Sequence, residues 1–220
     1  MGRVLTLPSA CRRALVAALA ATWMVARAST VLGATYFVDC QSGRDEASGT
    51  APTAAWRSFE AVHRTTFLPG DNIRLRAGCE WIGTLSPRGS GAEGRPITLG
   101  PYGDGAGPLI NGAGATAALL LTDQDFWEIS DLRFTNDAPA PGLRRGGLVR
   151  TIATGRVFTH IYLRRLDVRD VRGQLGAEME AKTTGGIGFE TRGAPSAARF
   201  DDVRIEDCVI ERVDSVGIYL

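Results

Sequence analysis

The chain has 220 residues, of which 25 are Lys or Arg and 24 are Asp or Glu, so its formal net charge is +1. No basic excess is available for phosphate groups, which excludes nucleic acid as the main partner. A hydrophobic share of 44% also excludes a disordered acidic chain. The 27 Gly and 10 Pro residues favour many short strands and tight turns over long helices.

The first thirty residues have the organisation of a secretory signal peptide. A basic start precedes a continuous apolar run at 14–25, and the small residues of Ala26-Arg27-Ala28 follow it. A membrane anchor is the alternative, but a span needs roughly 20 apolar residues, and this run is shorter. We therefore predict a signal peptide over 1–28, with cleavage possible as late as Ala34, and a secreted, extracellular protein that is free of the membrane after cleavage.

Export allows the cysteines to pair. Cys11 would leave with the signal peptide, so Cys40, Cys79 and Cys208 remain. Cys40 and Cys79 both sit beside turn residues and are predicted to form a disulfide that staples the amino-terminal module. Cys208 falls at an apolar strand position and is more simply a small core residue.

Residues 35–112 are predicted to form that amino-terminal module. Residues 35–38 have the composition of a short strand, and 54–65 form the one good amphipathic helix of the mature chain. The apolar face of this helix carries Trp56, Phe59 and Val62. After Pro69-Gly70, which ends the helical pattern, short β patterns follow at 73–77, 97–99 and 109–112.

From residue 127 onward the chain repeats. Segments 127–134, 161–168 and 203–210 superimpose without gaps, and each has apolar residues at relative positions 1, 3, 6 and 8. The period of two in each half is that of a strand, and the step of three inserts one residue that turns the chain. The residues at this corner, which we expect in a left-handed backbone conformation, are Asp131, Arg165 and Asp207.

A third strand accompanies each unit, at 146–149, 185–190 and 216–220. Such a coil must stack on copies of itself to bury its apolar side. The pattern resembles the right-handed parallel β-helix, the pectate-lyase-like architecture of many secreted bacterial proteins that act on polysaccharides. The stretch from Tyr36-Phe37-Val38-Asp39 to Pro101-Tyr102-Gly103 is similar to the leading module of such proteins.

The resemblance implies an all-β fold, a right-handed parallel β-helix solenoid in which the helix at 54–65 is an N-terminal capping helix. Residues 35–112 would be the cap and first coil, and 113–220 the following coils. The last residues, Tyr219-Leu220, lie inside a strand, so we expect a β-helix that is truncated at its C-terminus, a fragment of a longer protein. This architecture hosts lyases, hydrolases, epimerases and non-enzymatic surface proteins, so it does not specify the activity.

The inserted segments at 137–146, 172–185 and 191–202 flank the strand 185–190, where the resemblance places a substrate. Cleavage of a glycosidic bond commonly needs two carboxylates, and Glu190 and Asp214 are the predicted catalytic pair, on strands about 4.8 Å apart. Solvated charge at a sheet edge is the alternative for both. The predicted substrate-binding residues are Arg150, Lys182, Arg192 and Tyr219, the last either stacking on a sugar over a glycine floor or being a scattered surface aromatic.

β-Elimination would require a cation or Ca²⁺ to neutralise a uronate carboxylate and an Arg or Lys to take the proton. No Asp cluster of calcium-loop spacing occurs, and His63 and His160 lack a second ligand nearby, so no metal site is predicted. We expect a monomer, a polysaccharide lyase or glycoside hydrolase that acts on an extracellular polysaccharide by hydrolysis or elimination, with Ca²⁺ as a cofactor only if it is a lyase. The alternative is a non-catalytic β-helix protein of the surface, glycan-binding or adhesin-like.

Overall fold

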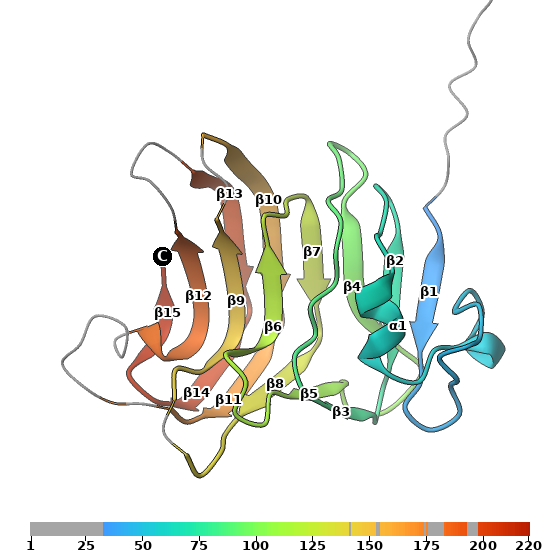
Figure 1. Cartoon of the computed structure of the whole chain (residues 1–220), viewed down its shortest axis with the longest axis horizontal. Helices are drawn as coiled ribbons and strands as arrows, with labels where there is room; N and C mark the ends of the chain where they lie inside the picture. The colour runs from blue at the N-terminus through green and yellow to red at the C-terminus, as the bar shows by residue number, and fades with distance from the viewer. Residues whose placement is uncertain (1–32, 141, 153–154, 174, 176–182, 193–197) are drawn as a thin grey trace, which may run out of the picture. The chain divides into compact units, whose positions relative to one another are not determined.

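The computed structural model describes residues 33–140, 142–152, 155–173, 175, 183–192 and 198–220. Within these ranges the strands form three sheets in which every strand pairs parallel to its neighbours, with little helix (Figure 1). The expected signal peptide at 1–28 lies outside the described residues. None of the described helices has the length and apolar character that a membrane span requires.

The largest sheet has six strands in the order β1-β2-β4-β7-β10-β13. Their alternation of apolar and polar residues explains why they form a sheet with one buried face: in β2, Ile73 and Leu75 are buried while Arg74 between them is half-buried on the outer face. The strands are β1 (Thr35–Val38), β2 (Asn72–Arg76), β4 (Ile97–Tyr102), β7 (Trp127–Ser130), β10 (Val157–Arg164) and β13 (Arg199–Glu206).

The other two sheets are formed by the remaining strands. The five-stranded sheet has the order β14-β11-β8-β5-β3, and the four-stranded sheet has the order β15-β12-β9-β6. The strands of the first are β3 (Glu80–Ile82), β5 (Leu109–Asn111), β8 (Arg133–Asn136), β11 (Asp167–Val171) and β14 (Val209–Val213). Those of the second are β6 (Ala117–Thr122), β9 (Arg145–Thr151), β12 (Gly185–Thr191) and β15 (Val216–Tyr219).

One hydrophobic core receives the inward side chains of all three sheets. The repeat predicted from the sequence sets its register, because Leu163 of β10 pairs with Ile129 on one side and with Ile205 on the other. All three residues therefore stand in one column that points into the core. The same core contains side chains from the other sheets, among them Phe134, Val168, Leu121 and Ile187.

The corners that follow β7, β10 and β13 have the left-handed conformation that the repeat predicts. The φ angles of Asp131, Arg165 and Asp207 are 61°, 50° and 55°. Arg165 also binds the preceding corner, because its Nε and Nη2 donate to the two carboxylate oxygens of Asp131 at 2.6 and 2.8 Å. This pair holds the pKa of Asp131 below its ordinary value.

A disulfide joins Cys40 to Cys79, with the Cα atoms 5.8 Å apart. Cys40 follows β1 and Cys79 precedes β3, the outermost strands of two different sheets at the same end of the fold. The covalent link therefore connects the edges of these sheets. Cys208 is a free thiol that packs against the core from its periphery.

The capping helix expected over 54–65 is not present. Residues Pro52–Ala54 form a 3-10 turn, and only Phe59–Arg64, the helix α1, is α-helical. Trp56 between them is extended, because its N–H donates to the carbonyl of Phe37 at 2.9 Å and its carbonyl accepts from the N–H of Asp39 at 2.7 Å. The spacing of the apolar residues predicts one helical face, but pairing with β1 holds Trp56 outside the helix.

The prediction of a right-handed parallel β-helix solenoid is likewise corrected, to an all-parallel fold of three separate sheets. The repeat of apolar positions specifies which side chains point inward and which strands are neighbours. It does not specify one continuous coil, because the connections between sheets differ: two residues, 131–132, separate β7 from β8, whereas residues 137–144 separate β8 from β9.

Candidate functional site

Glu190, a predicted catalytic residue, lies near the carboxyl end of β12 with 9% of its side chain exposed. Its Oε1 accepts hydrogen bonds from Arg145 Nη2 at 2.7 Å and from the Tyr219 hydroxyl at 2.6 Å. Its Oε2 accepts one from Arg192 Nε at 2.9 Å. Burial acts to raise the pKa of Glu190, but the Tyr219 hydroxyl and the two guanidinium groups outweigh it and lower this pKa. An ionised carboxylate held in this way is not suited to act as a general acid, which needs a raised pKa.

Tyr219 fills the space that we expected to be open to a sugar. A Cβ atom on Gly188 would lie 2.1 Å from Cζ of Tyr219 and 2.3 Å from its hydroxyl oxygen, so the tyrosine ring lies directly over this glycine. The hydroxyl also accepts from Arg145 Nε at 2.9 Å. Burial and the nearby Glu190 carboxylate raise the pKa of Tyr219 to about 12. The glycine floor is therefore covered by the protein's own ring.

Arg145 is the centre of this group and was not predicted. Its side chain is 1% exposed and it donates to Thr183 Oγ1 at 2.5 Å as well as to Glu190 and Tyr219. Burying a guanidinium without a charge partner costs several kcal/mol of folding free energy. The ion pair with Glu190 offsets this cost. Nothing in the local sequence distinguishes Arg145 from the many other arginines, because its partners lie 38, 45 and 74 positions further along the chain.

Asp214, the other predicted catalytic residue, does not lie beside Glu190. It precedes β15, whose first residue, Val216, pairs with Gly185, the first residue of β12. Glu190 is five positions beyond Gly185, which is about 16 Å along a strand. The Asp214 carboxylate instead accepts a hydrogen bond from the N–H of Gly173 at 3.0 Å. Strands that run parallel bring their starts together, so a residue before one strand cannot face the end of the next.

The predicted binding residues are only partly brought together. Arg150 of β9 is in register with Glu190 and donates to Thr122 Oγ1 at 3.2 Å, while Arg192 binds Glu190 directly. Lys182 lies outside the described residues. Among the residues that the structure does describe, no three His, Cys, Asp or Glu side chains are grouped so that they could hold a metal ion.

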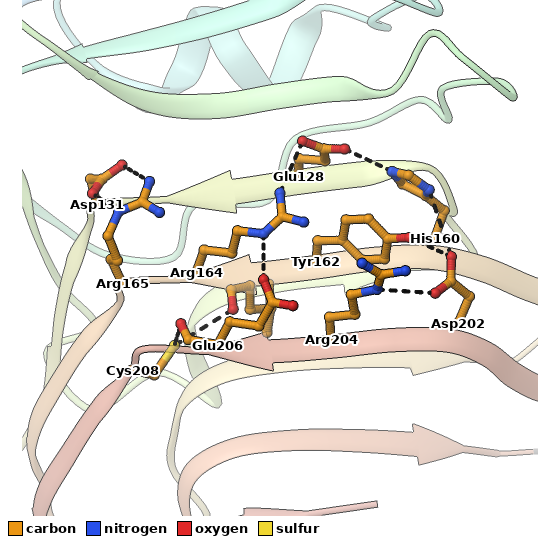
Figure 2. A network of polar contacts seen from close by, with 11 residues as sticks. Glu128, Asp131, His160, Tyr162, Arg164, Arg165, Asp202, Arg204, Glu206 and Cys208 are labelled. Atoms are coloured by element: carbon orange, nitrogen blue, oxygen red, sulfur yellow. Dashed lines mark hydrogen bonds and ion pairs between the residues drawn. The ribbon is translucent and has the colours of Figure 1, made fainter.

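A larger polar cluster, which was not predicted, lies on the outer side of three strands of the six-stranded sheet, β7, β10 and β13 (Figure 2). We call it the outer polar face. It is carried by neighbouring strands in register: Glu128 pairs with Tyr162, and Tyr162 with Arg204. The face comprises Glu128, His160, Tyr162, Arg164, Asp202, Arg204 and Glu206.

His160 connects two carboxylates of the outer polar face. Its Nε2 lies 2.8 Å from Glu128 Oε1, and its Nδ1 lies 3.8 Å from Asp202 Oδ2. The imidazole also stacks on the ring of Phe126, with 5.7 Å between centroids. Phe126, His160 and Asp202 all have positive φ angles, of 56°, 56° and 51°. The same local turn of the backbone therefore recurs just before β7 and within β10 and β13.

Tyr162 lies between two arginines. The guanidinium carbons of Arg164 and Arg204 are 4.7 and 4.5 Å from the centre of its ring, which is cation–π geometry. Its hydroxyl donates to Asp202 Oδ2 at 2.5 Å. This hydrogen bond raises the pKa of Tyr162 and lowers the pKa of Asp202, so the phenol is protonated and the carboxylate ionised at neutral pH.

Arg164 joins the two ends of the face and borders a pocket. Its Nε donates to Glu206 Oε2 at 2.7 Å and its Nη1 to Glu128 Oε2 at 3.3 Å. The adjoining pocket has a volume of about 240 Å³ and polar side chains from four neighbouring strands. Hydroxyl groups of a sugar can exchange hydrogen bonds with such a lining. The polar side chains are Arg74, Thr98, Glu128, Ser130, Arg164 and Arg165.

The residues of this face occupy the polar positions that alternate with the apolar positions of the repeat. Relative position 2 carries Glu128, Tyr162 and Arg204, and position 4 carries Ser130, Arg164 and Glu206. Strand alternation places both sets outward once the apolar positions are assigned inward. The predicted site rested on the long loops instead. The orientation of His160 depends on a positive φ that no local sequence pattern indicates.

Solved structures similar to this chain include two of the GH136 lacto-N-biosidase from Eubacterium ramulus. The native protein is 25% identical with a TM-score of 0.76 over 84% of this chain and 35% of that chain; its selenomethionine derivative is 25% identical with a TM-score of 0.75 over 82% and 34%. This chain thus spans about a third of the length of the enzyme. No protein-family model and no curated protein matches it.

These findings correct the expected resemblance. In place of a pectate-lyase-like protein, the chain is similar in fold to a carbohydrate-active enzyme of the glycoside hydrolase type. An alginate lyase from a Paenibacillus species, with a TM-score of 0.34 and 14% identity, is too dissimilar to support an argument. The coarse prediction of a carbohydrate-active protein agrees with the lacto-N-biosidase likeness at the level of the fold.

Proposed function

We propose that this chain is part of a secreted protein that hydrolyses glycosidic bonds in an extracellular glycan. The observation that carries the proposal is the likeness to the GH136 lacto-N-biosidase, at TM-scores of 0.75 and 0.76 over more than four-fifths of the chain. Hydrolysis is favoured over elimination because the similar enzyme is of the glycoside hydrolase type, which cleaves the bond with water. Since fold alone does not determine activity, a measurement of the reaction is required.

The outer polar face is the surface that we assign to the glycan. It presents carboxylates, guanidinium groups and a phenol in fixed positions, because each is held by its neighbours at the distances given above. Groups that are held in place before binding lose little freedom when a ligand arrives. Phe126 and His160 add a stacked pair of rings at the edge of this face, and such rings can pack against the apolar side of a pyranose.

A non-catalytic, glycan-binding role is the second candidate, and one observation favours it. The carboxylates of Glu128, Asp202 and Glu206 each contact an arginine or histidine, and both oxygens of Glu190 accept hydrogen bonds. Hydrolysis requires one carboxyl group that is protonated and one that is available to water or the sugar. These four carboxylates therefore fit binding better than acid–base chemistry.

The test is an assay of the purified secreted protein on lacto-N-tetraose, a chromogenic lacto-N-bioside and a uronate polysaccharide. We expect new reducing ends or released chromogen without ultraviolet absorbance from unsaturated sugars. Unsaturated products would overturn hydrolysis in favour of elimination. Glycan binding by calorimetry without any product would support the second candidate. A protein that neither binds nor cleaves these glycans would contradict both.

A further inference from the structure

Arg74, on the outer side of β2, is the arginine next to the outer polar face whose charge the fold leaves unbalanced. It pairs in register with Gly100 of β4. A Cβ atom on Gly100 would lie 3.4 Å from Arg74 Nη1 and 3.5 Å from Ser130 Oγ. The Arg74 guanidinium and the Ser130 hydroxyl, which both line the 240 Å³ pocket, therefore come close to each other beside Gly100.

The pocket contains three guanidinium groups, and two of them already have anionic partners. Arg165 makes two hydrogen bonds to Asp131, and Arg164 lies between Glu128 and Glu206. Within the part of the chain that the structure describes, no carboxylate pairs with Arg74. One positive charge in the pocket is therefore available to a ligand.

Glu128, the one carboxylate that lines this pocket, is bound by partners other than Arg74. Its Oε1 contacts His160 and its Oε2 contacts Arg164, and Figure 2 shows the carboxylate held between these two side chains. Its negative charge is thus balanced within the outer polar face, by Arg164 and His160. An anion that approaches Arg74 from the Gly100 side meets a cation and a hydroxyl.

We propose that this pocket binds the carboxylate of an acidic sugar residue, with Arg74 as its charge partner. The planar guanidinium matches a carboxylate through two parallel hydrogen bonds, and the Ser130 hydroxyl in the same pocket can donate another. The proposal rests on the proposed function, because it assigns a substrate class to the same face. It predicts a preference for uronate- or sialate-containing glycans over neutral ones.

The test measures the affinity of the full secreted protein, and of three variants, for a neutral oligosaccharide and for carboxylated and sulfated ones of equal length. Arg74→Gln should weaken binding of the carboxylated glycan about tenfold, the loss of roughly one charge-assisted hydrogen-bonded pair, and should leave the neutral glycan unaffected. Arg57→Gln, the same change at an exposed arginine outside the pocket, is the matched control. Gly100→Val keeps the charge but places a side chain against Arg74 and Ser130, and should weaken binding of the carboxylated and the neutral glycan alike.

The outcomes separate this proposal from the proposed function. The carboxylate proposal is supported if Arg74→Gln no longer prefers the carboxylated glycan, keeps the wild-type melting temperature, and Arg57→Gln binds like the wild type. Equal affinity of the wild-type protein for neutral and carboxylated glycans overturns it and leaves the glycan-acting function intact, as does an Arg74→Gln variant that keeps the preference. Sulfated glycans binding as tightly as carboxylated ones would overturn the carboxylate assignment. Binding of no glycan at all would reject both proposals.

Discussion

A single buried arginine organises the face where catalysis was predicted. Arg145 is almost fully buried and is neutralised by Glu190, whose remaining hydrogen-bonding capacity is met by Tyr219 and Arg192. In this arrangement the carboxylate stabilises a cation that the fold has taken out of water. Glu190 therefore has a structural role, neutralising Arg145, and this role can be tested without any substrate.

Replacing Glu190 by Gln should lower the free energy of unfolding by about 3 kcal/mol, because it leaves the buried Arg145 without a counter-charge. Urea denaturation of the two proteins measures the difference. The control is Glu60→Gln, since Glu60 is 78% exposed in its pair with Arg64 and should change stability by less than about 1 kcal/mol. Equal stability of wild type and Glu190→Gln would show that the buried pair is unimportant.

Tyr219 should make the protein sensitive to alkali. A pKa raised to about 12 in the folded state, against about 10 for an ordinary tyrosine, means that folding favours the protonated phenol. This stability is fully present below about pH 10 and is lost as the pH rises through about 12. In Tyr219→Phe, the midpoint of denaturant unfolding should fall less steeply between about pH 10 and about pH 12. A pH titration followed by tyrosinate absorbance should also lose its step at high pH. The same slope in both proteins would refute the assignment.

At the level of elements, the tight corners were predictable and the helix was not. The corner follows from the step of three in an otherwise alternating pattern, and all three predicted residues have positive φ. The helix failed because apolar spacing cannot reveal that Trp56 hydrogen-bonds to β1. A local pattern predicts local geometry well and long-range pairing poorly.

The corner after β7 provides a test of this geometry. Asp131→Val should destabilise the protein by about 1–2 kcal/mol, because a β-branched residue is strained at the φ of 61° found here. Asp131→Asn tolerates that conformation and loses only the exposed pair with Arg165, about 0.5 kcal/mol. Chemical denaturation of both variants compares the two effects. If Asn costs as much as Val, the ion pair and not the backbone controls this corner.

Across the whole molecule, the sequence predicts strands, their neighbours and their inward side chains, but not the site. The column of Ile129, Leu163 and Ile205 follows from aligning three segments. The site residues depend on which positions meet across sheets and loops. Arg145 and Glu190 come together from 45 residues apart, and Asp214 is separated from Glu190 only because parallel strands share a direction.

The disulfide at the amino-terminal end should contribute to the stability of the whole fold. It closes a sequence separation of 39 residues, and such a link stabilises by about 2–4 kcal/mol, mainly by restricting the unfolded chain. A Cys40→Ser, Cys79→Ser double variant should melt at a lower temperature than the wild type. Reductant should lower the melting temperature of the wild type alone. A double variant as stable as the oxidised protein would contradict this.

The regular spacing of the strands in the six-stranded sheet has a consequence for the length of ligand that can bind across it. Parallel strands are spaced by about 4.8 Å. A glycan chain that lies across the strands therefore meets a side chain at the same register position about every 4.8 Å. The length of the oligosaccharide that the protein prefers would then depend on the number of strands that it crosses. Adding or removing a strand would change this length without changing any single contact.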